Sequence, residues 1–372
     1  MAMWKNIPAN AAKKNNNELN CPPVSMSNLI CYSFCGLKWK GKAGKQQGVE
    51  KSLKIIEAEK LEKTYNGFTA VKGVNFHINR GEIFGFLGPN GAGKTTTINM
   101  LTGLARITGG RVKLLGEDYT GNPRKAQAMM GIVPDESNLY EELNGWENLS
   151  FCGALYGMER NWREEKAHQL LDQFGLEDAA KKPFKAYSKG MKRKLTIAAG
   201  IIHEPEILFL DEPTTGIDVA FARQIRNLIL DLHQKGTTIF LTTHYIEEAE
   251  RLCERIAFIV DGEIVREGTV AELMKEAQGE NIVNFMLGGD FKEVKTEFTA
   301  TFPGFEYRIG KDGVVSVHSP ESFTLMPLVQ FFEDRGFPVY EAKIARLSLE
   351  EVFVKVTGLE LKKMQNRKEA RV

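Results

Sequence analysis

Residues Ile83 to Thr95 read IFGFLGPNGAGKT, and they indicate what kind of protein this is. Ile83 to Leu87 form a short apolar run, which predicts a buried strand. The residues after it match the phosphate-binding pattern G-x-x-x-x-G-K-[ST], and a helical pattern follows from about Thr95 to Leu104. A buried strand, a glycine-rich loop and a helix in this order are the context that the pattern requires, so the sequence predicts a phosphate site.

Each position of this loop has a physical reason. Its glycines allow successive backbone N–H groups to converge on phosphate oxygens without clashes from Cβ atoms. Lys94 adds a positive charge toward the β and γ phosphates, and the Thr95 hydroxyl can ligate Mg²⁺. The following helix directs its positive end at the same phosphates. The predicted phosphate-binding residues are Gly88, Pro89, Asn90, Gly91, Ala92, Gly93, Lys94 and Thr95.

A second signal is the apolar run Ile207–Leu210, which is followed by Asp211 and Glu212. The run predicts a central strand with both acids at its end. Asp211 is then placed to hold Mg²⁺, directly or through water. Glu212 is placed to orient or deprotonate the water that attacks the γ phosphate. Apolar runs that end in acids are common, and this one gains its meaning from the phosphate loop.

Two weaker patterns accompany these motifs. The segment Ser188–Met191 predicts a capped helix whose N-terminus can bind an anion. The three basic residues Lys192–Lys194 after it are interpreted as a solvated helix face. His244 follows an apolar strand, Thr237–Leu241, and two threonines. A lone His is more often structural, but beside a phosphate site it is a candidate γ-phosphate contact.

Strand and helix patterns alternate between residues 54 and 278, which predicts an α/β fold with a parallel sheet covered on both faces. The runs Ile55–Leu61 and Val74–Ile78 predict strands with a turn at Asn66-Gly67 between them. Residues 140–205 are almost entirely helical and are interpreted as a helical insertion. Capping-box spacing occurs at Asn144/Glu147, Asn161/Glu164, Thr269/Glu272 and Ser348/Glu351.

The remaining segments differ from residues 54–278 in composition and in their pattern of apolar residues. Residues 281–358 combine strand patterns with helices near 291–299 and 321–334, and predict a small α+β accessory domain. It lacks a dense set of catalytic residue types, so a structural or dimer-supporting role is favoured over a ligand sensor. Residues 1–50 are rich in Lys and Asn and are predicted to be a flexible arm, and residues 359–372 a basic tail.

Composition excludes several classes. The 372 residues are 42% hydrophobic and 26% charged, as in ordinary folded proteins. The net charge of +1 argues against a nucleic-acid coat, so no nucleic-acid partner is expected. No run approaches the ~20 apolar residues of a membrane-spanning helix, and no secretory pattern is visible. The five Cys form no disulfide pattern, which favours a cytoplasmic setting. Cys31 and Cys35 are interpreted as free thiols, because no His or second Cys pair lies at ligand spacing.

The motifs together resemble the nucleotide-binding subunit of an ABC transporter, over residues from about 54 to 275. Gly88 to Thr95 match the Walker A motif, and Ile207 to Glu212 match Walker B. Ser188–Met191 resemble the family signature, and His244 matches the switch histidine. The order and spacing are those of the family, and no other phosphate-loop ATPase class shares this set. The resemblance implies an ABC cassette with a parallel-sheet core, an antiparallel β subdomain and a helical insertion.

The resemblance also implies roles for single residues. The implied catalytic residues are Lys94, Glu212 and His244, and the implied Mg²⁺ ligands are Thr95, Asp211 and Asp135. Tyr65 resembles the aromatic residue that stacks on adenine, and Asp218 belongs to the segment Thr215–Asp218 at the family's D-loop. Further implied ATP-binding residues are Thr96 in the loop and Ser188, Lys189, Gly190 and Met191 in the signature.

Three positions depart from the family pattern. Lys189 and Met191 replace a Gly and the Gln of the usual Ser-Gly-Gly-Gln signature, and Asp135 stands where the Q-loop usually has Gln. Asp135 keeps a metal-ligand role, since a carboxylate near Asp211 can bind Mg²⁺ itself. The departure puts in question the other role implied for this position, which is to couple ATP hydrolysis to the membrane partner.

The likeness is nearest to exporters whose membrane subunits are encoded separately, of the drug, sodium-ion or lantibiotic kind. It implies an ATPase that dimerises, with itself or a paralogous subunit, around two ATP and drives an integral membrane permease from the inner face of the cell membrane. The alternative is a soluble regulatory ATPase that acts on ribosomes or DNA. Such relatives usually carry tandem cassettes or a coiled-coil insertion, and this chain has one phosphate loop and no heptad insertion.

Overall fold

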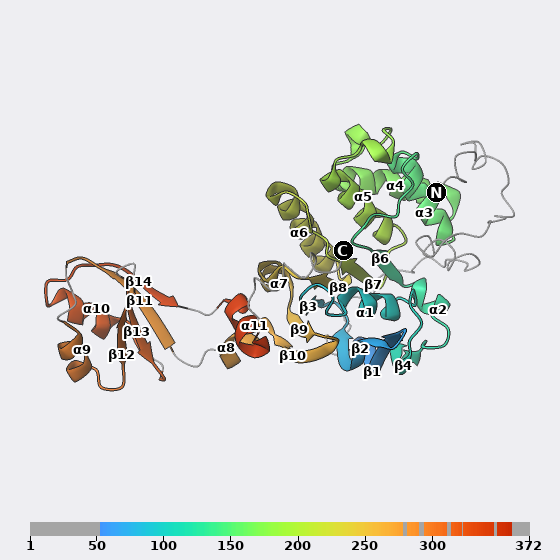
Figure 1. The fold of residues 1–372 in the computed structure, drawn as a ribbon. Coiled ribbons are helices and arrows are strands. Elements are labelled where there is room, and N and C mark those ends of the chain that lie inside the picture. The colour runs from blue at the N-terminus through green and yellow to red at the C-terminus, as the bar shows by residue number, and fades with distance from the viewer. Residues whose placement is uncertain are drawn as a thin grey trace.

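The computed structural model describes residues 53–277, 281–289, 294–310, 314–321, 323–345 and 348–358. The predicted arm at 1–50, with Cys31 and Cys35, and the predicted tail at 359–372 lie outside the described residues. The described chain has two parts (Figure 1). We call residues 53–277 together with helix α11 (Leu349–Thr357) the large part, and residues 281–345 the small part.

Two sheets build the large part. One has four strands in the order β2-β1-β4-β5, and its neighbours pair antiparallel. The other has six strands in the order β10-β9-β3-β8-β7-β6, in which only the edge strand β10 is antiparallel to its neighbour. The first sheet consists of β1 (Lys54–Tyr65), β2 (Phe68–Asn79), β4 (Gly109–Leu114) and β5 (Glu117–Asp118). The second consists of β3 (Ile83–Leu87), β6 (Met130–Val133), β7 (Ile207–Asp211), β8 (Thr238–Thr243), β9 (Arg255–Val260) and β10 (Glu263–Thr269).

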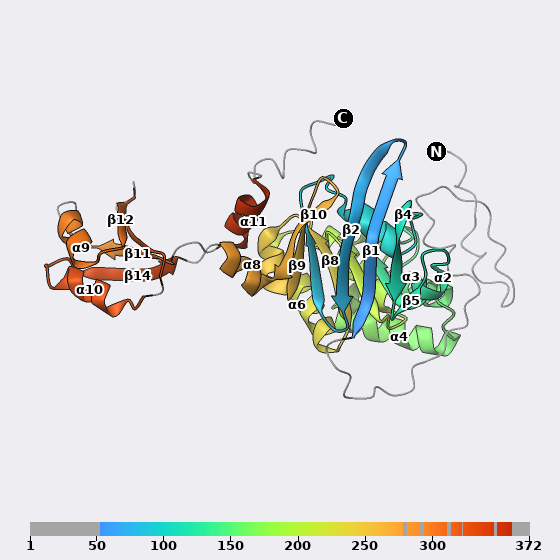
Figure 2. The ribbon, with the colours of Figure 1, turned by 90° about the horizontal axis from the view of Figure 1, so that it is seen from below.

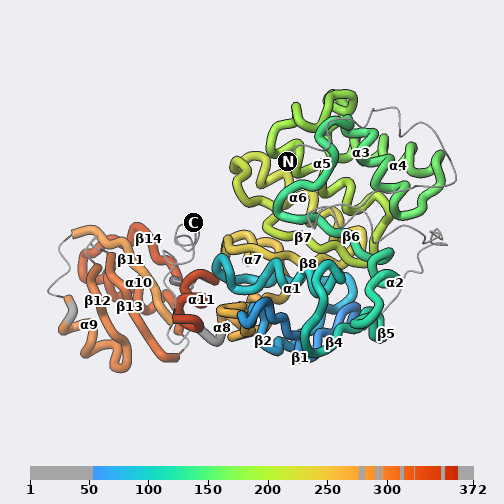
Figure 3. The backbone as a smooth tube through the Cα atoms, turned by 45° about the vertical axis from the view of Figure 1, so that its right-hand side comes forward, coloured from blue at the N-terminus to red at the C-terminus, as the bar shows by residue number. Residues whose placement is uncertain are grey.

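The helices of the large part fall into two groups. Those near the six-stranded sheet are α1 (Lys94–Leu101), α2 (Arg124–Gln127), α6 (Val219–Gln234), α7 (Ile246–Leu252) and α8 (Val270–Ala277). The others, between β6 and β7 in the chain, are α3 (Gly145–Leu155), α4 (Arg160–Gln173) and α5 (Lys189–Ile201), with short 3-10 turns at Glu177–Ala179 and Phe184–Ala186. This second group gathers on one side of the molecule, as Figure 3 shows. It forms the helical segment that the sequence places at 140–205.

Alternating side chains of the six-stranded sheet enter two separate apolar clusters. In β7, Leu208 and Leu210 join a cluster with the helices, while Ile207 and Phe209 join a cluster with the antiparallel sheet. Both sets are fully buried. A sheet that is covered on both faces requires such continuous apolar strands. The predicted α/β fold with a parallel-sheet core is therefore confirmed.

The small part is an antiparallel sheet with two helices. Its strands lie in the order β12-β13-β11-β14, and its core is rich in aromatic rings, among them Phe285, Phe298 and Phe332. Its elements are β11 (Asn281–Leu287), α9 (Lys295–Thr301), β12 (Glu306–Ile309), β13 (Val315–Ser319), α10 (Met326–Glu333) and β14 (Val339–Ala345). Helix α10 begins later than the predicted residue 321, with Pro327 in its first turn, a position that proline favours.

Helix α11 differs from the predicted division of the chain. Its expected place is in the accessory domain at 281–358, yet Leu349, Val352 and Phe353 are fully buried in the helix-side core of the large part. The Phe353 ring meets the Phe258 ring edge-on, with centroids 5.2 Å apart. Figure 2 shows α11 beside α8, at the large part rather than among the strands of the small part. The chain thus leaves the large part after α8 and returns to it at α11. The apolar side chains of α11 are buried in the core of the large part.

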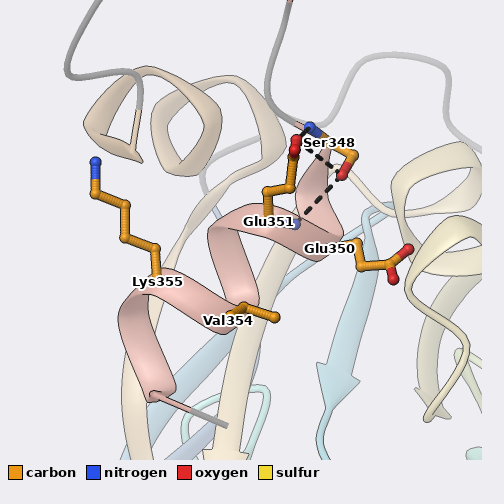
Figure 4. Close-up of a pocket in the computed structure, with 5 residues that line it drawn as sticks. All are labelled: Ser348, Glu350, Glu351, Val354 and Lys355. Atoms are coloured by element: carbon orange, nitrogen blue, oxygen red, sulfur yellow. Dashed lines mark hydrogen bonds between the residues drawn. The ribbon is translucent and has the colours of Figure 1, made fainter. Parts of the chain in front are cut away.

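The predicted helix starts are mostly confirmed. Asn144 and Ser348 form full capping boxes, the latter drawn in Figure 4, and Thr269 exchanges the same two hydrogen bonds with Glu272. The pair Asn161/Glu164 is wrong as a cap. The N-cap of helix α4 is Glu159, two residues before Asn161, and Glu164 forms an ion pair with Arg160 across one helical turn. In the described part of the chain, no helix is both long and apolar enough to span a lipid bilayer.

Candidate functional site

The predicted phosphate loop connects β3 to α1 at the carboxyl edge of the six-stranded sheet. This edge is where open parallel sheets bind ligands. A Cβ atom on Gly88 would lie 2.1 Å from the Ile259 carbonyl oxygen, so no other residue fits there. Gly93 has φ +106°, a left-handed conformation, and a Cβ there would lie 2.7 Å from the Ala70 oxygen. The loop is thus held tightly between β9 and the start of β2.

The Lys94 side chain is 6% exposed and points back into this loop. Its Nζ donates hydrogen bonds to the carbonyl oxygens of Gly88 at 2.8 Å and Pro89 at 3.3 Å. The same ammonium lies 3.1 Å from Glu212 Oε1. Lys94 therefore joins the phosphate loop to the end of β7, and the two predicted motifs form one site.

Glu212 lies at the centre of this site. His244 donates from Nδ1 to Glu212 Oε2 at 2.7 Å, and the Thr215 hydroxyl donates to the same oxygen at 3.0 Å. Burial acts to raise the pKa of Glu212, but the hydrogen bond from His244 and the charge of Lys94 outweigh it, so the pKa lies below its usual value. The three residues expected to be catalytic, Lys94, Glu212 and His244, are therefore in direct contact around an ionised carboxylate.

The backbone of Glu212 is also unusual. Its φ is +49°, which places a residue with a Cβ in the left-handed region. Such conformations cost on the order of 1–3 kcal/mol and persist where the surroundings fix them. Here the Glu212 amide donates to the Thr242 carbonyl of the neighbouring strand at 3.0 Å. This backbone conformation directs the carboxylate toward Lys94 and His244.

The three predicted metal ligands lie at the same edge. Asp211 is buried and accepts hydrogen bonds from the hydroxyls of Thr242 and Thr95. Burial raises its pKa, and the negative charges of Glu212 and Asp135 raise it further, against those hydrogen bonds. Asp135 is exposed after β6. The described residues hold no cluster of three or more His, Cys, Asp or Glu side chains suited to a metal. The Thr95 hydroxyl and the Asp211 carboxylate share a hydrogen bond, and both are oxygen donors of the kind that Mg²⁺ prefers.

The signature residues occupy a separate place. Ser188 caps α5 by accepting from the Met191 amide at 3.3 Å, and Ser188 and Lys189 are exposed. Gly190 is buried against Phe221, whose ring would lie 2.6 Å from a Cβ at that position, and Met191 is half-buried. Within the described residues, no hydrogen bond or ion pair joins this segment to the phosphate loop of the same chain. The segment presents a capped helix N-terminus to solvent.

Of the remaining predicted nucleotide contacts, Tyr65 and Asp218 are exposed. Tyr65 ends β1, is 44% exposed, and has the Lys63 ammonium 4.5 Å from its ring centroid. Asp218 caps α6 by accepting from the Phe221 amide at 3.0 Å. Lys189 reaches the same region, since a Cβ on Gly216 would lie 2.2 Å from its Nζ. Thr96 is half-buried in the first turn of α1.

Arg193 is the residue that the sequence interpretation missed. It is 6% exposed, so the prediction of a solvated face at Lys192–Lys194 is wrong for this residue. Its guanidinium reaches the turn at Asp135 and the end of β7. The signal was present in the sequence, because Gly190, Arg193 and Ile197 follow the helical spacing of the buried face of α5.

Two hollows lie outside the site. A small groove of about 50 Å³ lies where the turn after β6 meets α3 and α5, and we call it the turn groove. It is lined by Ile132, Asn138, Leu139, Tyr140, Phe151, Cys152, Leu155, Tyr156, Thr196, Ala199 and Gly200. A wider hollow of about 480 Å³ follows α11, and its lining residues, labelled in Figure 4, include none of the predicted site residues.

Comparison with known proteins gives consistent matches. A family model described as ABC transporter matches residues 71–215. The daunorubicin/doxorubicin resistance ATP-binding protein DrrA of Streptomyces peucetius is 36% identical over 307 residues, which are 82% of this chain and 93% of that protein. The Nod factor export ATP-binding protein I of Ralstonia nicotianae is 34% identical over 311 residues, 84% of this chain and 96% of that protein.

A solved structure matches as well. A dimeric ATP-binding cassette, in a post-hydrolysis state with ADP and Pi, aligns with a TM-score of 0.54 and 28% identity. The alignment covers 58% of this chain and 98% of that one.

Proposed function

Since this chain belongs to the ABC transporter family and is one of its ATP-hydrolysing subunits, we propose that it powers export through a separate membrane subunit. The observation that carries the hydrolytic role is the contact of Lys94 and His244 with the Glu212 carboxylate, at 3.1 and 2.7 Å. An ionised carboxylate held on both sides is suited to orient water and accept its proton.

Glu212 aligns a water whose oxygen bonds to the γ phosphorus, while the bond from that phosphorus to the β–γ bridging oxygen breaks. The proton of the water passes to the Glu212 carboxylate, and the products are ADP and phosphate. Lys94 holds the phosphate oxygens in the loop, and His244 fixes the carboxylate through its Nδ1 hydrogen bond. Tyr65 stacks on the adenine, and the loop amides of residues 88–96 hold the phosphates.

Thr95 and Asp211 are the residues that would hold Mg²⁺, since their side chains already share a hydrogen bond, with Asp135 as a third oxygen donor. When bound there, Mg²⁺ neutralises charge on the phosphate oxygens. Asp211 itself is kept in place by Thr242 on the neighbouring strand.

The signature segment acts on a second copy of the chain or a paralogous subunit. Ser188, Lys189 and Gly190 begin a helix whose N-terminus faces solvent, and they do not close the phosphate loop of their own chain. In a head-to-tail dimer this N-terminus covers the open side of the other copy's γ phosphate, with Met191 and Asp218 beside it. Closure excludes water around the site, and this strengthens the electrostatic interactions inside.

The membrane partner binds at the turn groove, on the inner face of the cell membrane. The groove is lined largely by apolar and aromatic side chains, and Tyr140 at its rim is 47% exposed and meets Phe151 edge-on at 5.1 Å. The groove adjoins Asp135 through the turn after β6. A partner segment seated there touches the same turn that Arg193 connects to the hydrolytic site.

Copurification tests this proposal. Tyr140→Glu places a charge in the groove and should sharply reduce recovery of an integral membrane subunit with the tagged chain from detergent extracts. Tyr340→Glu is the matched control, because Tyr340 is 71% exposed on β14 and lies outside the groove. Equal recovery in both variants would remove the groove from the proposal. Absence of any membrane subunit with the unchanged chain would favour a regulatory ATPase instead.

A further inference from the structure

Arg193 is a buried cation that makes four hydrogen bonds, all to backbone carbonyl oxygens. Its Nε donates to Pro213 at 2.9 Å, its Nη2 donates to Asp211 at 2.7 Å, and its Nη1 donates to Pro134 and, at 3.1 Å, to Asp135. A guanidinium has five donors in a fixed plane, so nearly all of its capacity is used here. The side chain therefore ties helix α5 to two backbone segments, the turn at 134–135 and the chain at 211–213.

Two of these carbonyls flank Glu212. Asp211 lies directly before it and Pro213 directly after it, and both carbonyls point at the same guanidinium. Glu212 itself has φ +49°. The Asp211 carbonyl belongs to the peptide group that precedes Glu212, so its hydrogen bond restricts the rotation about φ of Glu212. The Pro213 carbonyl belongs to the peptide group after Pro213, and its hydrogen bond anchors the chain on the other side of Glu212. Arg193 thus stabilises the strained backbone conformation that directs the Glu212 carboxylate at Lys94 and His244.

The charge of Arg193 suits this place. Burial lowers the pKa of its guanidinium to about 10, against the negative charges of Asp135, Asp211, Glu248 and Glu212, so it stays protonated at neutral pH. The acceptors of its four hydrogen bonds are carbonyls rather than carboxylates, which leaves the carboxylates available for other partners. A lysine could supply the charge but not this planar set of donors.

We propose that Arg193 is a positioning residue for ATP hydrolysis, which holds the Glu212 backbone and ties it to helix α5. Arg193 is buried, and it acts through the carbonyls of Asp211 and Pro213. Helix α5 is capped by Ser188, the residue assigned to the ATP of the second copy. The tie therefore lets engagement of one ATP set the geometry of Glu212 at the other. This inference rests on the hydrolytic role proposed for Glu212.

Steady-state ATP hydrolysis by the full chain tests the inference. Arg193→Gln removes the charge and three of the five donors, and it should lower kcat by about 100-fold, the effect of misplacing a reacting group by about 1 Å. KM for ATP should stay near that of the unchanged chain, since the phosphate loop is intact. Arg193→Lys keeps the charge and part of the bonding, and should give an intermediate kcat. Rates are expressed per nucleotide-binding site counted by calorimetry, so that unfolded protein does not contribute.

Two control variants separate positioning from stability. Lys194→Gln changes a charge on the same helix, and Gln127→Ala removes a buried amide that donates to the Thr102 carbonyl at 2.9 Å, away from the site. Both should keep kcat, and Gln127→Ala should lower only the free energy of unfolding. If Arg193→Gln hydrolyses ATP at the full rate per bound nucleotide, the inference fails while the proposed function stands. If the unchanged chain hydrolyses no ATP, the proposed function fails first.

Hydrogen exchange keeps the inference testable should Arg193→Gln not fold. In Arg193→Lys, amides in a peptide spanning residues 207–217 should exchange faster, while amides of β9 should not change. Unchanged exchange at 207–217, together with a full kcat, would refute the inference.

Discussion

Charged side chains are buried at the carboxyl edge of the six-stranded sheet, whereas in the small part they lie on the surface. The buried ones at the edge are Lys94, Arg193, Asp211, Glu212 and Glu248. In the described residues of the small part, Arg308 and Glu306 pair with side chains 57% and 63% exposed, and Arg335 and Glu297 pair with side chains 28% and 59% exposed. The buried polar side chains there are His318 and Ser319. The two sheets have similarly apolar cores and differ in where they keep charge.

The difference indicates where the chemistry is. Burying a charge costs several kcal/mol unless partners compensate it, and a fold keeps such charges where they shift the properties of reacting groups. At the edge Glu212 is compensated by three partners, since Lys94, His244 and Thr215 all bond to it. Among the described residues of the small part, the aromatic core contains no buried ion pair of this kind, which favours a structural role for it.

The largest expected effect tests the buried carboxylate directly. Glu212→Gln keeps the size of the side chain but removes the group that accepts the proton, and it should lower kcat by about 10²–10⁴-fold. ATP binding should remain, because Lys94 and the loop are unchanged, so ATP-bound dimer should accumulate. Phosphate release and size-exclusion chromatography with ATP measure the two outcomes. Hydrolysis at the full rate would take Glu212 out of its assigned role.

Much of this edge could be predicted from the sequence because its motifs are local. The phosphate loop and the acids after β7 are runs of adjacent residues, and the order of strand, loop and helix carries their meaning. Arg193 could not be found this way. Its four carbonyl acceptors belong to Pro134, Asp135, Asp211 and Pro213. The first two precede α5 in the chain and the last two follow it, so all four meet Arg193 only in the folded protein.

The position of α11 illustrates the same limit. Its cap at Ser348 and its end at Gly358 are local features, and both are found in the structure. The whole small part separates Phe353 in the chain from the core that buries it. The apolar stripe of a helix does not indicate which of two cores it will join. Asn161 failed for the opposite reason, since two local patterns competed and the ion pair of Arg160 with Glu164 lies inside the helix.

The second prediction concerns which part each aromatic residue stabilises. Phe353→Ala empties a fully buried site in the large part and should lower its free energy of unfolding by about 3–5 kcal/mol. Phe332→Ala does the same in the small part, whose core contains that ring. Denaturant unfolding followed by fluorescence reports on the large part through Trp146 and Trp162, which pack against its core.

The fluorescence transition should therefore shift in Phe353→Ala and stay in place in Phe332→Ala. Far-ultraviolet circular dichroism, which follows both parts, should detect a loss in each variant. A fluorescence shift in Phe332→Ala as large as that in Phe353→Ala would mean that the two parts unfold as one unit, and the comparison between them would lose its basis.

The smallest effect is expected where the charge is exposed. Arg308→Ala breaks the surface pair with Glu306 and should change the free energy of unfolding by less than about 1 kcal/mol, because water already solvates both groups. Arg193→Gln differs, since each buried carbonyl that loses its donor costs about 1–3 kcal/mol. Denaturant unfolding followed by circular dichroism compares the two arginines in one protein. A loss in Arg308→Ala that matched the one in Arg193→Gln would show that burial does not set the value of these cations, and the contrast between the two sheets would then say nothing about where hydrolysis occurs.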